Sequence, residues 1–222
     1  MTWNATPCSR WQLYVVLDRA ALRGRDPVEI AAAAIRGGAD ALQWRDKGGS
    51  ARDILETAGR LLPIARRADI PLIINDRADL ARAIGADGVH LGQEDLPLAA
   101  ARDILGPGRL IGKSTHSPEQ AASAQAEGAD YLGFGPIFPT PTKPDSGSVG
   151  LTRLNEISRT IHIPVVCIGG IDRTNAQQVI ESGGRCIAVV RAVCRANDPE
   201  SAARELKQRI VQFTRPTAAP SL

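Results

Sequence analysis

The sequence predicts an α/β fold, a single (β/α)8 TIM barrel with short mobile N- and C-terminal tails. Short β-branched runs alternate with longer alanine-rich amphipathic stretches, and eight of these runs have the length of strands. This alternation is typical of parallel strands joined by helices, which excludes all-β and all-helical folds. Eight strand-helix units favour a closed barrel. A doubly wound open sheet remains the alternative, because periodicity does not reveal whether a sheet closes.

The expected strands recur at similar intervals and share turn signals at their starts. In chain order they are residues 13–17, 41–44, 72–74, 88–91, 110–112, 131–134, 165–168 and 187–190. The triplet Gly-Ala-Asp precedes three of them, and residues 183–185 look like a degraded fourth copy. A glycine at this place ends a helix in a left-handed cap. Pro71 and Pro164 stand at two other strand entrances, where no ladder donor is needed. The repeating unit is therefore two βα pairs, and four such units make the barrel.

Length and composition fit one domain. With 222 residues and 43% hydrophobic content the chain can bury one substantial core, although two smaller domains are also compatible with this length. We expect the barrel to span residues 11–214. The flanking segments 1–10 and 215–222 are rich in Thr, Ala, Pro and Ser and lack periodicity, so they are predicted to be mobile tails.

Charge and cysteine content argue against several classes of protein. A net charge of +3 does not point to a nucleic-acid or membrane partner, although local basic sites for anionic ligands remain compatible with it. Apolar stretches are only as long as strands, and no signal sequence is recognisable, so we expect a cytoplasmic protein. The four cysteines form no Cys-x-x-Cys pair, which argues against a zinc site or a disulfide framework. Cys167 and Cys186 are expected to be buried packing residues.

Polar residues gather where the predicted strands end. In a barrel the loops after the strands form one face, where chemistry takes place. Lysine and arginine side chains are the usual partners of phosphate, and Arg45 and Lys143 come to this face from distant loops. Either cation alone is compatible with a merely solvated charge. The two together, with the amide and hydroxyl residues around them, indicate a ligand that carries more than one phosphate.

Asp76 and Asp95 follow neighbouring predicted strands at equivalent positions. Their carboxylates should approach one another across the mouth of the barrel. Magnesium takes one or two carboxylates together with waters and substrate phosphate oxygens, so the pair is a candidate metal site. The alternative is that one or both aspartates cap the following helix, because Asp is a favoured N-cap residue.

A candidate monophosphate site follows the last two predicted strands. Gly169 and Gly170 end the seventh, and Val190 and Arg191 end the eighth. Loops at these two positions often bind phosphate through backbone amides. A pair of glycines is also compatible with an ordinary tight turn.

Together these motifs resemble the thiamine-phosphate synthase family, also called thiamine-phosphate pyrophosphorylase. The resemblance runs from about Leu13 to beyond Arg195. Its most specific pieces are the runs Gln-Trp-Arg-Asp-Lys at 43–47, Ile-Asn-Asp at 74–76, His-Leu-Gly-Gln-Glu-Asp at 90–95 and Gly-Pro-Ile-Phe-Pro-Thr-Pro-Thr-Lys at 135–143.

The resemblance implies a transferase of thiamine biosynthesis. It would condense 4-amino-2-methyl-5-pyrimidinylmethyl diphosphate with a thiazole phosphate and release pyrophosphate, by a dissociative route assisted by Mg2+. It implies Asp76 and Asp95 as the metal ligands. The residues implied in substrate binding or catalysis are Gln43, Trp44, Arg45, Asp46, Lys47, Asn75, Ser114, Thr140, Pro141, Thr142, Lys143, Gly170, Val190 and Arg191. Of these, Lys143, Arg45 and Ser114 are the expected catalytic residues.

Two departures from the family pattern bear on the second substrate. The family usually has a small hydroxyl residue in place of Arg191 and more often a glutamate in place of Asp46. Arg191 could add a contact to the thiazole phosphate or point to solvent, and we favour the added contact. His116 lies near the expected active face, but the implied pathway needs no general base, so an orienting role is favoured.

Two other functions remain as alternatives. One is a thiazole tautomerase-like enzyme, and the other is a catalytically silent binder of thiamine intermediates. The tautomerase family resembles the chain less at Asn75, Asp76 and Asp95. Small-molecule substrates are the expected partners in each case, and a homo-oligomer is compatible with the sequence.

Overall fold

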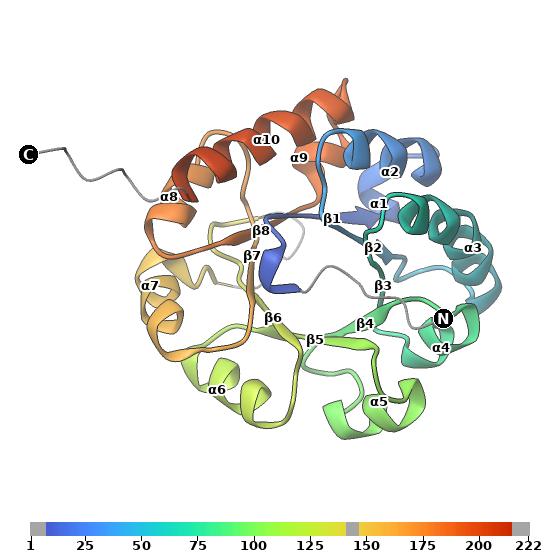
Figure 1. The fold of residues 1–222 in the computed structure, drawn as a ribbon, viewed down its shortest axis with the longest axis horizontal. Coiled ribbons are helices and arrows are strands. Elements are labelled where there is room, and N and C mark those ends of the chain that lie inside the picture. The colour runs from blue at the N-terminus through green and yellow to red at the C-terminus, as the bar shows by residue number, and fades with distance from the viewer. Residues whose placement is uncertain (1–7, 141–146, 215–222) are drawn as a thin grey trace, which may run out of the picture.

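A computed structural model describes residues 8–140 and 147–214 and contains the predicted closed barrel of eight parallel strands (Figure 1). Each strand pairs with the next along the chain, and β1 pairs with β8 to close the sheet, with Leu13 opposite Ile187. The strands are β1 (Leu13–Asp18), β2 (Ala41–Arg45), β3 (Leu72–Asn75), β4 (Gly88–Leu91), β5 (Leu110–Thr115), β6 (Tyr131–Phe134), β7 (Val165–Ile168) and β8 (Cys186–Val189). The open-sheet alternative is therefore wrong.

Five strands have bounds that differ from the sequence prediction, and β1, β2 and β3 each end one residue later than expected. β5 continues three residues beyond the expected end at residue 112, so Ser114 lies within a strand and not in the following loop. Gly112 lowers the strand propensity there, but the strand continues because Lys113, Ser114 and Thr115 pair with β6. β8 begins and ends one residue earlier than expected, which leaves Val190 at the N-cap of the next helix.

Helices surround the barrel on all sides (Figure 1). They are α1 (Arg19–Leu22), α2 (Pro27–Arg36), α3 (Ala51–Arg67), α4 (Ala78–Ile84), α5 (Leu98–Leu105), α6 (Pro118–Ala126), α7 (Gly150–Thr160), α8 (Ala176–Glu181), α9 (Arg191–Cys194) and α10 (Pro199–Thr214). The longest, α3, begins with a capping box between Ser50 and Asp53. Among the described residues no helix is long and apolar enough to cross a membrane.

The Gly-Ala-Asp triplets fix the amino ends of the strands. Their glycines have positive φ angles, as a left-handed helix end requires, for example 72° at Gly85. Each aspartate then accepts a hydrogen bond from a backbone N–H at the start of the preceding strand. Asp40 Oδ2 accepts from Leu13 at 2.8 Å, and equivalent bonds join Asp87 to Leu72 at 2.8 Å and Asp130 to Ile111 at 2.7 Å.

The buried apolar residues form two layers. The larger layer lies between the strands and the helices, and a smaller one fills the inside of the barrel around Trp11, Tyr14 and Tyr131. The 3-10 helix η1 (Cys8–Arg10), which the sequence analysis placed in the N-terminal tail, lies over the middle of the barrel (Figure 1). Residues 1–7 and 215–222 of the predicted tails lie outside the described residues.

The four cysteines are all within the described part of the chain and are free thiols. Cys167 and Cys186 are buried in the apolar layers, which confirms the prediction that they are packing residues. Burial raises the pKa of the Cys167 thiol to about 12.

Candidate functional site

A cavity of about 470 Å3 occupies the carboxyl-terminal mouth of the barrel. It is lined by the ends of the strands and the loops that follow them, which is the face that the fold predicts for chemistry. Eight of the residues predicted from the sequence line it together: Gln43, Arg45, Asn75, Ser114, Thr140, Gly170, Val190 and Arg191. Pro141, Thr142 and Lys143 lie outside the described residues.

Arg45 is held at the cavity wall by an aspartate that the sequence analysis did not predict. Asp18 ends β1 directly opposite Arg45, and its Oδ2 atom contacts Nη1 of that arginine. The other oxygen of Asp18 accepts a hydrogen bond from the backbone N–H of Ala21 at 2.9 Å. The carboxylate is therefore fixed on both sides, and it orients the guanidinium. An acidic residue at the end of a buried strand run is the sequence signal that could have identified Asp18.

Asp76 and Asp95 meet at the rim of the barrel, as their positions after β3 and β4 predicted. Their carboxyl groups are hydrogen-bonded to one another, and Lys47 Nζ lies 2.8 Å from Asp76 Oδ2. Asp95 Oδ2 accepts from the backbone N–H of Gly92 at 2.6 Å. The capping alternative is wrong for both, because the N-cap residues of α4 and α5 are Arg77 and Pro97.

The electrostatics of this pair favour a cation. Burial is the main cause that raises the pKa of Asp76; Lys47 opposes this effect and the neighbouring Asp95 adds to it. Burial also acts to raise the pKa of Asp95, but hydrogen bonds from Asp76 and the Gly92 amide outweigh it and lower that pKa. Two adjacent carboxylates present a pair of oxygens suited to a hard divalent cation.

Additional protein ligands for such a cation are not found in the described ranges 8–140 and 147–214. No group of three or more His, Cys, Asp or Glu side chains converges there. Zinc sites usually need three or four protein ligands, whereas magnesium is commonly bound by one or two carboxylates plus water and phosphate. The donor set at Asp76 and Asp95 therefore fits magnesium.

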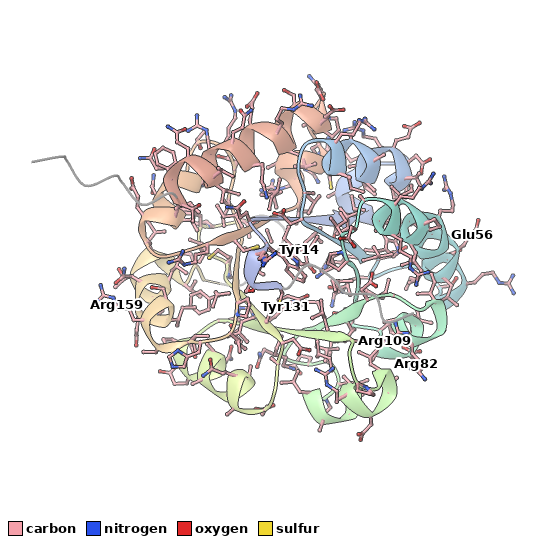
Figure 2. All side chains as sticks on the ribbon, in the orientation of Figure 1. Tyr14, Glu56, Arg82, Arg109, Tyr131 and Arg159 are labelled. Atoms are coloured by element: carbon pink, nitrogen blue, oxygen red, sulfur yellow. The ribbon has the colours of Figure 1, made fainter. Side chains whose placement is uncertain are left out.

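The floor of the cavity is a chain of five hydrogen-bonded side chains from five strands. Gln43 Nε2 donates to Tyr14 Oη at 2.9 Å, and the two tyrosine hydroxyls lie 3.2 Å apart. Tyr131 Oη is 3.1 Å from His90 Nδ1, and His90 Nε2 is 2.9 Å from Ser114 Oγ. Figure 2 shows Tyr14 and Tyr131 close to one another inside the ring of strands. Only the two ends of this chain, Gln43 and Ser114, were predicted from the sequence.

The candidate phosphate site lies on the wall formed by β7 and β8. Gly169 and Gly170 both have positive φ angles, 102° and 64°. A Cβ atom on Gly170 would lie 2.7 Å from the carbonyl oxygen of Pro139, so only glycine fits between the two loops. Asn175 Nδ2 donates to the Gly170 carbonyl at 2.8 Å and fixes the turn. This wall is continuous with Val190 and Arg191 in the lining of the cavity.

Two residues from the predicted 43–47 motif point away from the cavity. Trp44 alternates with Gln43 and Arg45 along β2, so its side chain is buried in the layer between the strands and the helices. Asp46 turns back into its own loop, where Oδ1 accepts from the Gly49 N–H at 2.8 Å and Oδ2 lies 3.2 Å from Arg19 Nε. The motif thus combines residues that line the cavity with residues that shape the surrounding structure.

His116 joins two loops at the cavity. Its ring Nδ1 contacts the carbonyl oxygen of Gly135, and its backbone N–H donates to Gln120 Oε1 at 2.8 Å. These contacts support the orienting role that the sequence analysis favoured over a general base.

Comparisons with known proteins show the family to which the chain belongs. A family model described as thiamine monophosphate synthase matches residues 13–193. The chain is 48% identical over 198 residues to the thiamine-phosphate synthase of Chloroflexus aurantiacus, covering 89% of this chain and 91% of that protein. It is 47% identical over 201 residues to the thiamine-phosphate synthase of Roseiflexus castenholzii, covering 90% and 88%.

Two solved structures resemble the chain to different degrees, one in both sequence and fold and the other in fold alone. Thiamine phosphate pyrophosphorylase from Pyrococcus furiosus has a TM-score of 0.87 and 39% identity, with 94% of this chain and 99% of that chain covered. The 3-hexulose-6-phosphate synthase from Salmonella typhimurium has a TM-score of 0.70 but only 15% identity, covering 91% and 99%. The second likeness concerns the barrel fold alone.

Proposed function

Because the chain belongs to the thiamine monophosphate synthase family, we propose that it is a thiamine-phosphate synthase that acts in the cytoplasm. The reaction joins 4-amino-2-methyl-5-pyrimidinylmethyl diphosphate to a thiazole phosphate and releases pyrophosphate. The observation that carries the proposal is the convergence of Arg45, Asn75 and Ser114 in one cavity, beside the carboxylate pair at its rim.

The bond changes of this reaction need little proton transfer. The bond between the pyrimidinylmethyl carbon and the diphosphate oxygen breaks, and the electron pair leaves with pyrophosphate. The lone pair of the thiazole nitrogen then forms the new carbon-nitrogen bond. The protein therefore has to stabilise charge on the leaving group and to orient the second ring, which are tasks for fixed charges and dipoles.

Positive charge to stabilise the leaving pyrophosphate would come from Arg45 at the end of β2 and from Lys47 just after it. Arg45, fixed by Asp18, presents its remaining N–H donors to the diphosphate, and Lys47 lies beside Asp76 at the rim. Asp76 and Asp95 would hold Mg2+, which supplies further positive charge to the phosphate oxygens when bound. Lys143 would complete the set from the loop after β6.

The thiazole phosphate would lie against the opposite wall. Gly170 leaves space for an anion to approach the backbone, and the Val190 and Arg191 segment borders the same space. Thr140 and Thr142 would add hydroxyl donors. The two phosphorylated rings then meet above the buried floor of the barrel.

One experiment separates this function from its alternatives. The purified protein is mixed with both phosphorylated heterocycles, with and without Mg2+, and pyrophosphate is measured. Release that requires both substrates and Mg2+ supports the synthase. A tautomerase or a silent binder would bind the thiazole phosphate without releasing pyrophosphate, and that result would contradict the proposal.

A further inference from the structure

The buried side chains beneath the cavity form an uninterrupted line of hydrogen bonds from Gln43 to Ser114. We propose that Tyr14, Tyr131 and His90 fix the hydrogen-bonding polarity of Gln43 and Ser114, so that the site selects a 4-aminopyrimidine over a 4-oxopyrimidine. This inference rests on the proposed function, because it concerns the pyrimidine substrate. Tyr14, Tyr131 and His90 act as positioning residues in it.

The direction follows from the hydrogen bonds one after another. Gln43 Nε2 donates to Tyr14 Oη, so the Tyr14 hydroxyl proton is available to Tyr131 Oη. If Tyr131 accepts from Tyr14, its own proton is left for His90 Nδ1, which lies 3.1 Å away. With Nδ1 as an acceptor, neutral His90 carries its proton on Nε2 and donates it to Ser114 Oγ. The Ser114 hydroxyl is then left with its own proton for the ligand.

Burial keeps the two tyrosines in the protonated form that this direction requires. Both side chains are almost fully buried, and desolvation raises the pKa of each hydroxyl above its ordinary value. Each tyrosine therefore has one proton to donate. A buried hydroxyl left without its partner costs free energy, so each bond in the line supports the direction of the next.

The barrel also leaves little room for a different arrangement. Gly112 and Gly133 lie under the rings: a Cβ atom on Gly112 would be 2.2 Å from Tyr131 Cζ, and one on Gly133 would be 2.9 Å from His90 Cε1. Trp11 packs against both tyrosines, with ring centroids 5.7 and 5.3 Å away. The close approach of the two glycines and the packing of Trp11 therefore hold the rings in place.

The two ends of the line present complementary groups to the cavity. Gln43 and Ser114 both line the cavity; with its Nε2 engaged by Tyr14, Gln43 has its carbonyl oxygen left as an acceptor for a ligand, and Ser114 has a donor. A 4-aminopyrimidine provides an amino donor and ring-nitrogen acceptors, which match both. A 4-oxopyrimidine has an acceptor in place of the amino group and a protonated ring nitrogen. To bind the 4-oxopyrimidine with the same hydrogen bonds, every donor and acceptor along the line would have to exchange roles.

Binding measurements test this inference without relying on reactivity. The 4-amino group also stabilises the reacting methyl carbon, so the comparison uses the unreactive 4-amino and 4-oxo pyrimidinylmethyl monophosphates. Calorimetry gives the ratio of their dissociation constants. Because the oxo ligand leaves buried polar groups unpaired, we expect the wild-type protein to prefer the amino ligand by about a hundredfold or more.

Tyr131→Phe interrupts the line while it keeps the ring that packs against Trp11. We expect the preference for the amino ligand to fall at least tenfold. Thr115→Val is the matched control, because it removes a buried hydroxyl of β5 that donates to the Gly133 carbonyl at 3.1 Å and lies outside the line. The control should keep the wild-type preference. An unchanged ratio in Tyr131→Phe would overturn the proposal.

A second measurement observes the direction itself. The chain has three histidines, so nitrogen NMR of the histidine-labelled protein is simple, and His90→Gln assigns the His90 signals. We expect the tautomer with the proton on Nε2 in the wild-type protein and a mixture of tautomers in Tyr131→Phe. A wild-type His90 with its proton on Nδ1 would reject the proposed direction.

The outcomes keep this inference separate from the proposed function. Wild-type protein that releases pyrophosphate but binds both monophosphates equally would refute only the polarity of the site. Protein that distinguishes the two monophosphates without releasing pyrophosphate would retain the polarity and refute the synthase.

Discussion

Asp18 and Arg45 stand opposite one another at the ends of β1 and β2, and the aspartate Oδ2 contacts the arginine Nη1. The side chain of Asp18 is only 6% exposed, and that of Arg45 is 22% exposed. The pair is therefore largely shielded from solvent while the guanidinium still reaches the cavity. Arg45 is positioned before any substrate arrives.

Asp18→Asn should lower turnover at least tenfold, because the guanidinium loses the charge that orients it, and small displacements of a positioning group are costly. Asparagine keeps an oxygen for the Ala21 N–H, so the start of α1 should remain folded. Steady-state kinetics with both substrates and circular dichroism check the two expectations. Turnover equal to wild type would show that Arg45 needs no such anchor.

Activity should require a divalent hard cation held by Asp76 and Asp95. We expect Asp76→Asn and Asp95→Asn to lower turnover and raise the Mg2+ concentration needed for half-maximal activity, with the fold intact by circular dichroism. A titration of Mg2+ after chelation measures this. Full turnover in excess chelator would rule out metal assistance.

Lys143→Ala should reduce turnover more than ground-state binding, because the ammonium group is predicted to neutralise charge that grows on the departing diphosphate. The loss of a preorganised charge contact commonly costs about a hundredfold or more. Separate values of kcat and KM for the pyrimidine substrate distinguish the two effects. If KM alone rises, Lys143 serves binding only.

Arg191→Ser restores the residue type usual in the family at the wall formed by β7 and β8. If Arg191 contacts the thiazole phosphate, the lost charged hydrogen bond of about 1.5 to 3 kcal/mol should weaken thiazole-phosphate affinity at least tenfold. The constant for the pyrimidine diphosphate should change little. Equal thiazole-phosphate affinity in the variant and the wild type would reject the added contact but not the backbone site.

Thiol titration at pH 8 should detect at most Cys8 in the folded protein. Burial raises the pKa of Cys167 and of Cys194 to about 12, so only about one thiol in ten thousand is ionised at this pH, and the thiolate is the reactive form. Cys186 is buried in the same way. All four should react in denaturant. Rapid reaction of a second thiol in the native protein would contradict the burial described for these residues.

The sequence was sufficient for the strands and helices, because hydrophobic periodicity and turn residues report directly on local structure, and the count of eight strands favoured the closed barrel. It was also sufficient for the meeting of Asp76 and Asp95, since equivalent positions on neighbouring strands converge in any parallel sheet. It was not sufficient for Tyr14, Tyr131 and His90. Their side chains form hydrogen bonds with one another only when the barrel closes. No local sequence pattern distinguishes a tyrosine that belongs to a hydrogen-bonded line from one that packs in an apolar core.

The motif 43–47 shows a related limit. Gln43, Arg45 and Trp44 are adjacent in sequence, but the alternation of a strand sends Trp44 to the helix layer and the other two to the cavity. A motif in a family therefore mixes residues that contact substrate with residues that hold the strand in place. The structure of the closed barrel shows which residues of the motif face the cavity and which face the helices.

The aspartates of the Gly-Ala-Asp triplets secure the end of the barrel that faces away from the cavity. Asp40 also binds Lys207 of α10 at 2.6 Å, and Asp130 binds Arg102 of α5 at 2.6 Å, so each joins a strand start to the outer helices. Arg185 stands at the fourth position and offers no carboxylate. Because closure is maintained at one end and chemistry takes place at the other, the substrate loops are free to diverge during evolution without loosening the scaffold that carries them.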